Sequence, residues 1–373
     1  MSHEREEDSY PEMDADRHSG ADCFERIYRA FLKAGPRTGE KIEGCYRLAG
    51  RTFRLRFAGD TLASKLTPAL SHLVGAPDEN PDLEICLWDS RTTGMKLPPP
   101  DWMPHDHLAR GEIRGFNRGR ILAAFQTGPD ILNMYDRERK RGLFWIRDAH
   151  QVPFYESAAP LRTILHWWMR TQGCQVIHAG AFGTDSCGVL LAGGGGAGKS
   201  TAALALGLSP GMEYAADDYC LLEPEPAPWI HSLYATAKLD GGSLKRLAHL
   251  ALPVDRPRRD GGKTVIYFQK RYSANLISGF PLKAVLCPRI TGSDRTAVRA
   301  ASSGESFRAL AVSSVFQLPG AGSSDLNRIA AAVREVPAFT LELGTDMIEA
   351  VRVVKEWWLQ MFSEERERHG FRF

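Results

Sequence analysis

The sequence predicts an α/β protein in which short apolar strands alternate with amphipathic helices. The clearest signal is an apolar run at 188–192, which leads into a glycine-rich segment at 193–198 and then into a helical run at 202–207. With 373 residues the chain is long enough for two domains. We therefore expect a larger α/β unit built around the strand-loop-helix segment, and a smaller α+β unit ahead of it.

Composition excludes several classes of protein. A formal net charge of +2 gives no electrostatic basis for binding nucleic acid or a membrane surface. No apolar run approaches the roughly 20 residues that a membrane-spanning helix needs. The first residues are acidic and polar, unlike a secretory signal. We therefore expect a cytoplasmic protein with no nucleic-acid partner and no membrane span.

The pattern along the chain indicates four parts. Residues 1–20 are rich in charged and small polar side chains, which predicts a disordered tail, and 364–373 form a second, charged tail. Between the tails we expect a small α+β domain at 21–155 and a larger P-loop-type α/β domain at 156–363.

The expected N-terminal domain begins with a helix, because apolar residues between 24 and 32 fall on one helical face. Alternation of apolar and basic residues predicts a hairpin at 46–57, with Ala49 and Gly50 in its turn. A strand is expected at 83–88. Three further strands are spaced as an antiparallel meander, at 121–126, 131–135 and 143–146.

The larger domain is expected to open with an amphipathic helix at 158–171 and a strand that begins at Gln175 and ends at His178. We expect this strand to run beside the apolar strand 188–192. Two further strands of the same sheet are predicted at 264–268 and 282–286. The remaining predicted elements are a strand at 338–343 and helices at 303–312, 324–333 and 347–361.

The segment after strand 188–192 matches the spacing G-x-x-x-x-G-K-[ST]. Its glycines let successive backbone N–H groups turn inward around an anion, and the helix behind them adds partial positive charge. Lys199 would reach the β- and γ-phosphates of a nucleotide, and the Ser200 hydroxyl would bind Mg²⁺. The expected nucleotide-binding residues are Gly193, Gly194, Gly195, Gly196, Ala197, Gly198, Lys199, Ser200 and Thr201.

Two adjacent carboxylates, Asp217 and Asp218, follow a short apolar strand downstream of the loop helix. In P-loop proteins this is where an acid holds Mg²⁺ and a neighbouring group can accept a proton. Side chains alternate along extended backbone, so one carboxylate can face the metal and the other the acceptor. His178 ends an earlier strand, and the expected strand order brings its imidazole near the phosphates.

Three segments carry a resemblance to a known family: Ile177-His178-Ala-Gly-Ala, the strand and loop from Gly188 to Ser200, and Ala216-Asp217-Asp218. In this order and at this spacing they resemble the catalytic domain of HPr kinase/phosphorylase. The whole chain looks like the HPr-kinase-related proteins of bacterial biosynthetic clusters. The resemblance is specific from about residue 158 to residue 223 and only patterned beyond that.

The resemblance implies a PEP-carboxykinase-like P-loop fold and transfer of phosphate from ATP to a serine hydroxyl, with Mg²⁺ as cofactor. It implies that Lys199 and the loop amides hold the phosphates, and that Ser200 and Asp217 hold Mg²⁺. Asp218 would be the base that takes the hydroxyl proton, and His178 would orient it or share the proton. The implied partner is a protein or ribosomal peptide that bears a serine. Since HPr kinase forms rings, a homo-oligomer is a further expectation.

The sequence also departs from HPr kinase. Thr201 stands where that enzyme has a glutamate, and the glycine-rich segment of its phosphorylase reaction has no counterpart downstream. HPr itself and phosphorolysis are therefore not implied. Two other interpretations stay open: a kinase for a small-molecule hydroxyl, and a nucleotide-binding regulatory or scaffold protein that transfers no phosphate. The second carboxylate favours catalysis, because binding alone has no need of it.

Overall fold

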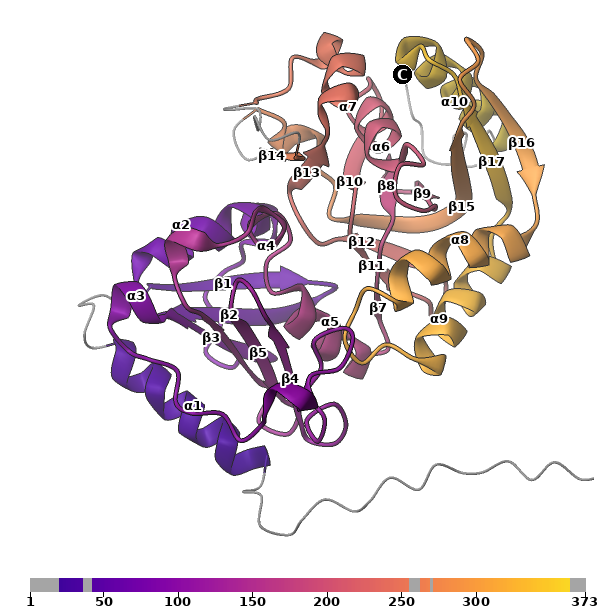
Figure 1. Ribbon diagram of the computed structural model, residues 1–373. Helices are drawn as coiled ribbons and strands as arrows, with labels where there is room; N and C mark the ends of the chain where they lie inside the picture. Colours follow the sequence, from indigo (N-terminus) through magenta and orange to yellow (C-terminus); the bar gives the residue numbers. More distant parts are fainter. Residues whose placement is uncertain (1–19, 36–41, 255–261, 269–270, 363–373) are drawn as a thin grey trace, which may run out of the picture.

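The computed structural model describes residues 20–35, 42–254, 262–268 and 271–362. They form a mixed α/β protein with two large mixed sheets, one of six strands and one of nine (Figure 1). The tails expected at 1–20 and 364–373 lie outside the described residues, except that Gly20 already belongs to the first helix. Within the described part, no helix has both the length and the apolar character needed to cross a bilayer.

The six-stranded sheet has the order β1-β2-β3-β6-β5-β4, with parallel pairing from β2 to β3 and from β3 to β6. The predicted hairpin and meander are both confirmed, since β1 to β2, β4 to β5 and β5 to β6 pair antiparallel. The elements of this half are α1 Gly20–Ala34, β1 Ile42–Leu48, β2 Arg51–Phe57, α2 Asp60–Leu66, a 3₁₀ helix Thr67–Leu73, β3 Leu83–Asp89, α3 Ser90–Thr93, β4 Ile121–Gln126, β5 Ile131–Asp136 and β6 Arg141–Ile146.

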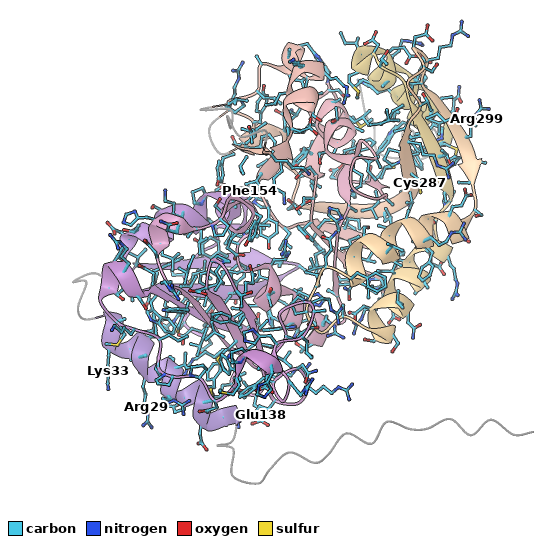
Figure 2. The ribbon with its side chains drawn as sticks, viewed as in Figure 1. Arg29, Lys33, Glu138, Phe154, Cys287 and Arg299 are labelled. Carbon is cyan, nitrogen blue, oxygen red and sulfur yellow. The ribbon has the colours of Figure 1, made fainter. Side chains whose placement is uncertain are left out.

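Helices cover both faces of this sheet. α1 buries Phe24, Ile27 and Phe31 against one face, because these apolar positions recur at helical spacing. Figure 2 shows Arg29 and Lys33 on the outer side of the same helix, pointing away from the sheet. The other face packs against α2 and against helix α5 (Arg162–Thr171) of the second half.

The nine-stranded sheet contains the strand order β10-β8-β9-β15-β12-β11-β7. The long strand β15 also pairs with β17, and β16 pairs with β17. Helices α6 and α10 cover one face, and α8 and α9 cover the other. The elements are α4 Phe154–Ala158, α5, β7 Gln175–Ile177, β8 Gly180–Thr184, β9 Cys187–Leu191, α6 Lys199–Gly207, β10 Glu213–Ala216, β11 Cys220–Glu223, β12 Trp229–Ser232, β13 Thr236–Leu239, α7 Gly241–Arg246, β14 Thr264–Tyr267, β15 Gly279–Ile290, β16 Ala297–Ala301, α8 Ser303–Val315, α9 Ser323–Arg334, β17 Ala338–Leu343 and α10 Met347–Met361.

The expected pairing of the histidine strand with the loop strand is wrong. A strand that the sequence analysis missed, β8, pairs antiparallel with β9, whereas β7 pairs with β11. β8 is rich in glycine, which hides its strand character. The glycines are required by packing, because a Cβ on Gly183 would lie 2.4 Å from the carbonyl oxygen of Cys187, and one on Gly188 of β9 would lie 1.8 Å from the ring of Phe280.

Two further expectations are corrected. The helix expected at 158–171 begins only at Arg162, as α5, because Pro160 cannot continue a helix and Leu161 adopts a left-handed φ of 58°; the shorter helix α4 precedes it. The strand expected at 264–268 does not join the main sheet. As β14 it pairs, among the described strands, with β13 alone, in a separate two-stranded ribbon.

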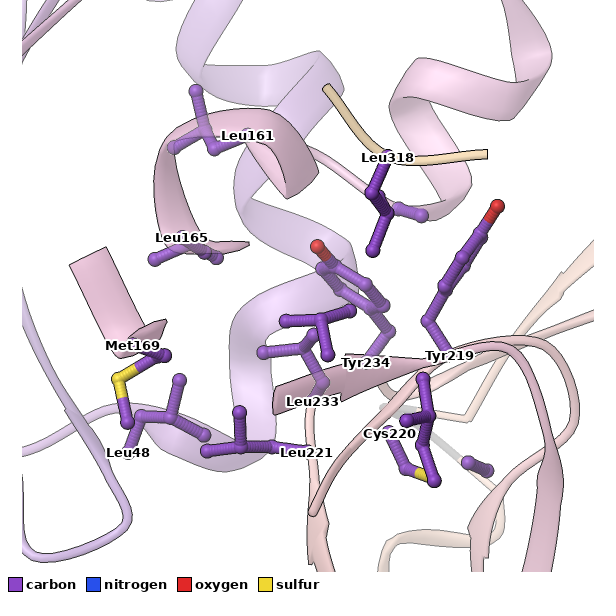
Figure 3. Close-up of a cluster of buried hydrophobic side chains, with 14 of the residues drawn as sticks. Leu48, Leu161, Leu165, Met169, Tyr219, Cys220, Leu221, Leu233, Tyr234 and Leu318 are labelled. Atoms are coloured by element: carbon purple, nitrogen blue, oxygen red, sulfur yellow. The ribbon is translucent and has the colours of Figure 1, made fainter. Parts of the chain in front are cut away.

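One cluster of buried side chains runs through both halves of the molecule. It joins Leu48 of β1 to Leu161, Leu165 and Met169 of the α5 segment, and to Leu221 of β11 (Figure 3). Hydrogen bonds cross the same boundary, from the backbone N–H of Ala235 to the carbonyl oxygen of Ala69 and between Ser232 Oγ and His72 Nε2. The two halves are therefore packed together through a shared apolar core.

Candidate active site

The phosphate-binding loop expected from the sequence connects β9 to α6. Gly196 and Gly198 have φ values of 78° and 97°, which L side chains rarely adopt. A Cβ on Gly198 would also lie 2.7 Å from Leu343 Cδ1 of β17. A Cβ on Gly194 or Gly195 would meet no protein atom within 4 Å, so this part of the loop borders open space. The loop conformation thus needs glycine at its end and leaves room at its centre.

Lys199 is the first residue of α6 and is 6% exposed. Its Nζ donates to the carbonyl oxygens of Gly193 and Gly194, at 2.7 and 3.0 Å. The ammonium group therefore lies over the loop itself, within reach of any anion that the loop amides hold. Burial lowers the pKa of Lys199, and the charges of Asp218 and Asp217 act in the opposite direction.

Asp217 is buried, at 4% exposed, where the chain leaves β10. Its carboxylate accepts from the backbone N–H of Lys238 at 2.9 Å and from Tyr214 Oη at 3.3 Å. It also shares a side-chain hydrogen bond with Ser200. Burial and the neighbouring charge of Asp218 raise the pKa of Asp217 to about 6, since both oppose its ionisation.

Asp218 is held by two cationic or proton-donating side chains. Its Oδ1 lies 3.0 Å from His178 Nε2, and its Oδ2 forms an ion pair with Lys238 Nζ. Burial alone would raise the pKa of Asp218, but the hydrogen bond to His178 and the charge of Lys238 outweigh it and hold that pKa below its usual range. Asp218 is therefore an ionised carboxylate near neutral pH.

His178 lies between β7 and β8, two strands at separate positions of the same sheet. Its backbone N–H donates to Ser314 Oγ of α8 at 3.0 Å, which anchors the turn. Its ring Nδ1 lies 3.4 Å from Gln317 Nε2, and its ring centroid lies 5.3 Å from that of Tyr219. The imidazole is thus held between Asp218 on one side and the end of α8 on the other.

These groups line one cavity of about 130 Å³. The loop from Gly195 to Thr201 forms one wall, and His178, Asp218 and Lys238 form another. Exposed basic side chains, Arg246 and Lys263, stand at its rim. A larger cavity of about 610 Å³ lies between the β1–β2 turn and β12, and none of the loop or carboxylate residues lines it. Volume alone would point to the larger cavity, but the smaller one contains the ionised and proton-donating groups.

The structure brings every sequence-predicted site residue to this region. Lys199, Asp218 and His178 line the cavity together with the loop glycines from Gly195 onward, and Ser200 lies beside Asp217. Gly193 and Gly194 contact Lys199 through their carbonyls.

Two residues of this region were missed from the sequence, Lys238 and Gln317. Lys238 lies in an ordinary-looking strand, where alternation with apolar neighbours was the one local signal. Gln317 lies in the turn after α8, and nothing in its neighbours indicates a role.

The donor set fits Mg²⁺ bound together with phosphates. Mg²⁺ usually takes one or two protein ligands and completes its shell with water and phosphate oxygens. Ser200 and Asp217 supply one hydroxyl and one carboxylate in contact with each other, directly beside the loop. Among the described residues, no group of three or more His, Cys, Asp or Glu side chains is arranged to hold a metal ion alone. A metal here would therefore depend on the phosphates it accompanies.

No protein-family model and no curated protein matches the sequence. Among solved structures, the Hpr(Ser) kinase/phosphatase from Coxiella burnetii is similar to this chain with a TM-score of 0.30 and 14% sequence identity. The match covers 50% of this chain and 98% of that chain. This is a weak structural likeness to one kinase/phosphatase, so the function has to be argued from the side chains of the cavity.

Proposed function

We propose that the protein is an ATP-dependent kinase that transfers the γ-phosphate to a serine hydroxyl of a protein or ribosomal peptide. One observation carries this proposal: the carboxylate of Asp218 is held ionised by His178 and Lys238, and it faces the same cavity as the phosphate-binding loop. A loop that only binds nucleotide needs no ionised carboxylate opposite its lysine. A base for an incoming hydroxyl does need one.

The phosphate side of the cavity supplies binding and charge neutralisation. The amides of the loop and the N-terminus of α6 would hold the phosphates, and Lys199 can move onto them from the carbonyls of Gly193 and Gly194. Ser200 and Asp217 would hold Mg²⁺. When bound, Mg²⁺ neutralises charge on the β- and γ-phosphates.

The acceptor side would carry out the proton transfer. The acceptor oxygen forms a bond to the γ-phosphorus while the bond from that phosphorus to the β,γ-bridging oxygen breaks, which leaves ADP. The proton of the hydroxyl passes to Asp218, and His178 keeps that carboxylate oriented. Lys238, which pairs with Asp218, is placed to stabilise charge as the phosphoryl group moves between the two walls.

The size of the cavity favours a macromolecular acceptor. Sites that enclose a small molecule usually measure about 300–1,000 Å³, whereas this cavity measures about 130 Å³. Phosphates bound at the loop would occupy much of that space. A hydroxyl presented from outside, on a peptide side chain, reaches Asp218 without a separate enclosed pocket. The need for ATP places such an enzyme in the cytoplasm.

The proposal extends to the fold of the larger half. The order of His178, the loop and the carboxylate pair supports a PEP-carboxykinase-like P-loop domain, preceded by the half that contains the six-stranded sheet. The strand that carries the loop lies inside the larger sheet, with β8 on one side and β15 on the other.

The test is incubation of the purified protein with γ-labelled ATP and Mg²⁺, alone and with candidate peptide substrates that contain serine. Asp218→Asn is the catalytic variant. Asp185→Asn, an exposed carboxylate on the β8–β9 turn, is the matched control. We expect label on a peptide serine with the wild type and the control, and none with Asp218→Asn.

Three other outcomes decide among the remaining interpretations. Label on a small-molecule hydroxyl in place of a peptide would show that the protein is a kinase but that the proposed peptide acceptor is wrong. Equal labelling by wild type and Asp218→Asn would remove the catalytic role of that carboxylate. Tight ATP binding without transfer to any acceptor would contradict the kinase proposal and favour a nucleotide-binding regulator.

A further inference from the structure

The turn 315–321, which begins at the last residue of α8 and leads towards α9, is held by a residue from the other half of the molecule. One guanidinium nitrogen of Arg110, Nη1, donates to the carbonyl oxygens of Val315, Leu318 and Ala321 at 2.9, 3.1 and 3.2 Å. Arg110 belongs to the loop that precedes β4 in the six-stranded half. A charged donor that reaches three carbonyls of one short turn fixes the path of its backbone.

Glu112 completes this contact. Its Oε1 accepts from the backbone N–H of Gly320 at 2.8 Å and lies 3.0 Å from Arg110 Nη2. Glu112 is 5% exposed, and its ion pair with Arg110 compensates the buried negative charge. Arg110 and Glu112 therefore act on the turn as a pair, one through its carbonyls and one through an amide.

Helix α5 holds the same turn from a second direction. Trp167 Nε1 donates to the carbonyl oxygen of Pro319 at 2.9 Å, and Arg170 Nη1 donates to that of Gly320 at 2.7 Å. Leu318 lies in the buried cluster that contains Tyr219 (Figure 3). Of the seven carbonyls in the turn, those of residues 315, 318, 319, 320 and 321 accept hydrogen bonds from outside it.

The same turn carries Gln317 to the ring of His178. Tyr219 Oη donates to Gln317 Oε1 at 2.6 Å, so the amide nitrogen of Gln317 faces the other way, towards His178 Nδ1 at 3.4 Å. An amide nitrogen only donates, so Nδ1 must accept. In neutral His178 the proton then lies on Nε2, which points at Asp218 Oδ1.

The Gln317 side chain is exposed, so packing does not hold it in place. Besides the hydrogen bond from Tyr219, its position depends on the backbone of the turn. We propose that Arg110 and Glu112 are positioning residues for catalysis: by holding the turn 315–321 they keep Gln317 on His178, and so keep the imidazole in the tautomer and orientation that serve Asp218. This inference rests on the proposed kinase function. It makes the six-stranded half a structural part of the active site.

The experiment compares Arg110→Ala, Arg110→Lys, Gln317→Leu and the double variant Arg110→Ala/Gln317→Leu. Arg114→Ala is the control, because Arg114 lies on the same loop with an exposed side chain. For each variant, kcat and the KM for ATP are measured in the labelling assay. In parallel, ¹⁵N-histidine spectra report the protonation of the two ring nitrogens of His178, assigned by their loss in His178→Gln.

We expect Arg110→Ala to lower kcat by about 10- to 100-fold with the KM for ATP nearly unchanged, since misplacement of a catalytic group affects turnover more than nucleotide binding. Arg110→Lys should recover part of kcat, because an ammonium group can still donate to the carbonyls. Gln317→Leu should match Arg110→Ala, and the double variant should be no worse than either single one. The His178 signals should change in all variants except Arg114→Ala.

An Arg110→Ala protein with normal kcat and unchanged His178 signals would overturn the inference. So would a double variant whose losses multiply, because the two residues would then act by separate routes. A wild type without transfer activity would contradict the proposed kinase. The spectra would still decide the positioning, because they need no turnover. Thermal unfolding of each variant separates loss of position from loss of fold.

Discussion

The two walls of the cavity are built in different ways. The phosphate side is one continuous segment, from Gly193 to Thr201, whose shape follows from consecutive glycines and a helix start. The acceptor side joins His178, Asp218 and Lys238, and Gln317, 139 positions from His178, contacts the histidine from outside the cavity. The first wall therefore takes its shape mainly from its local sequence, whereas the second depends on the whole fold.

The walls also differ in electrostatics. The phosphate side presents backbone amides and one lysine, whose pKa is lowered chiefly by burial. The acceptor side is a network in which a histidine and a lysine hold one carboxylate ionised. We therefore expect changes on the phosphate side to affect nucleotide affinity, and changes on the acceptor side to affect turnover or its pH dependence.

The largest effect should come from Asp218→Asn. Loss of the base should lower kcat by about 10³-fold or more, while the dissociation constant for ATP stays within about twofold because the loop is untouched. Single-turnover labelling and equilibrium ATP binding check the two halves of this prediction. A comparable loss of ATP affinity would show that Asp218, on the acceptor side, also contributes to nucleotide binding.

Lys199→Met, unlike Asp218→Asn, should change the affinity for ATP. Removing the ammonium group should weaken ATP binding by about 10²-fold, because it neutralises the phosphates of bound ATP, and should also slow transfer, because the charge it neutralises grows in the transition state. Binding measured by calorimetry, with the Asp218→Asn protein as reference, checks this. An unchanged affinity for ATP would show that Lys199 does not contribute to phosphate binding.

Lys238→Met should lower kcat by about 10²-fold or less and change its pH dependence. The charge of Lys238 helps to hold the pKa of Asp218 below its usual range. Without that charge the pKa of Asp218 rises, so more of the carboxylate is protonated at mildly acidic pH. The acidic limb of the kcat profile should therefore move to higher pH. An unshifted limb would mean that His178 alone sets the ionisation.

The smallest effect concerns stability. Burial and the charge of Asp218 raise the pKa of Asp217 to about 6, above its unfolded value. The folded state therefore favours the protonated form, and ionisation above pH 6 destabilises it. Without Mg²⁺, we expect Asp217→Asn to raise the free energy of unfolding by about 1–3 kcal/mol at pH 8, and by less as the pH falls below 6.

Urea unfolding at pH 8 and pH 5 measures this difference. The same variant should lose the extra stability that Mg²⁺ and ATP confer on the wild type, because a ligand that binds the folded state stabilises it. If Asp217→Asn is less stable than the wild type at pH 8, ionisation of Asp217 does not destabilise the folded state, and its pKa is not raised.

Much of the fold was predictable because its signals are local. Hydrophobic alternation located the hairpin of the first sheet, strand spacing located its meander, and apolar periodicity located α1 and α10. β8 was missed because Gly180 and Gly183 remove the side chains on which strand prediction depends. The late start of α5 shows the opposite case, where a long apolar stripe outweighed a single proline, Pro160, after which the helix in fact begins.

The site divides along the same line. The sequence by itself determined the conformation of the glycine-rich loop, because the positive φ of Gly196 and Gly198 and the helix start at Lys199 depend on neighbouring residues. It also indicated the carboxylate pair.

Only the tertiary structure decided which groups surround Asp218. Lys238 reaches it through the β13 ribbon, and Gln317 is carried to His178 by a turn that Arg110 holds from the other half. Such contacts depend on how sheets and helices pack, and no short stretch of sequence records that packing.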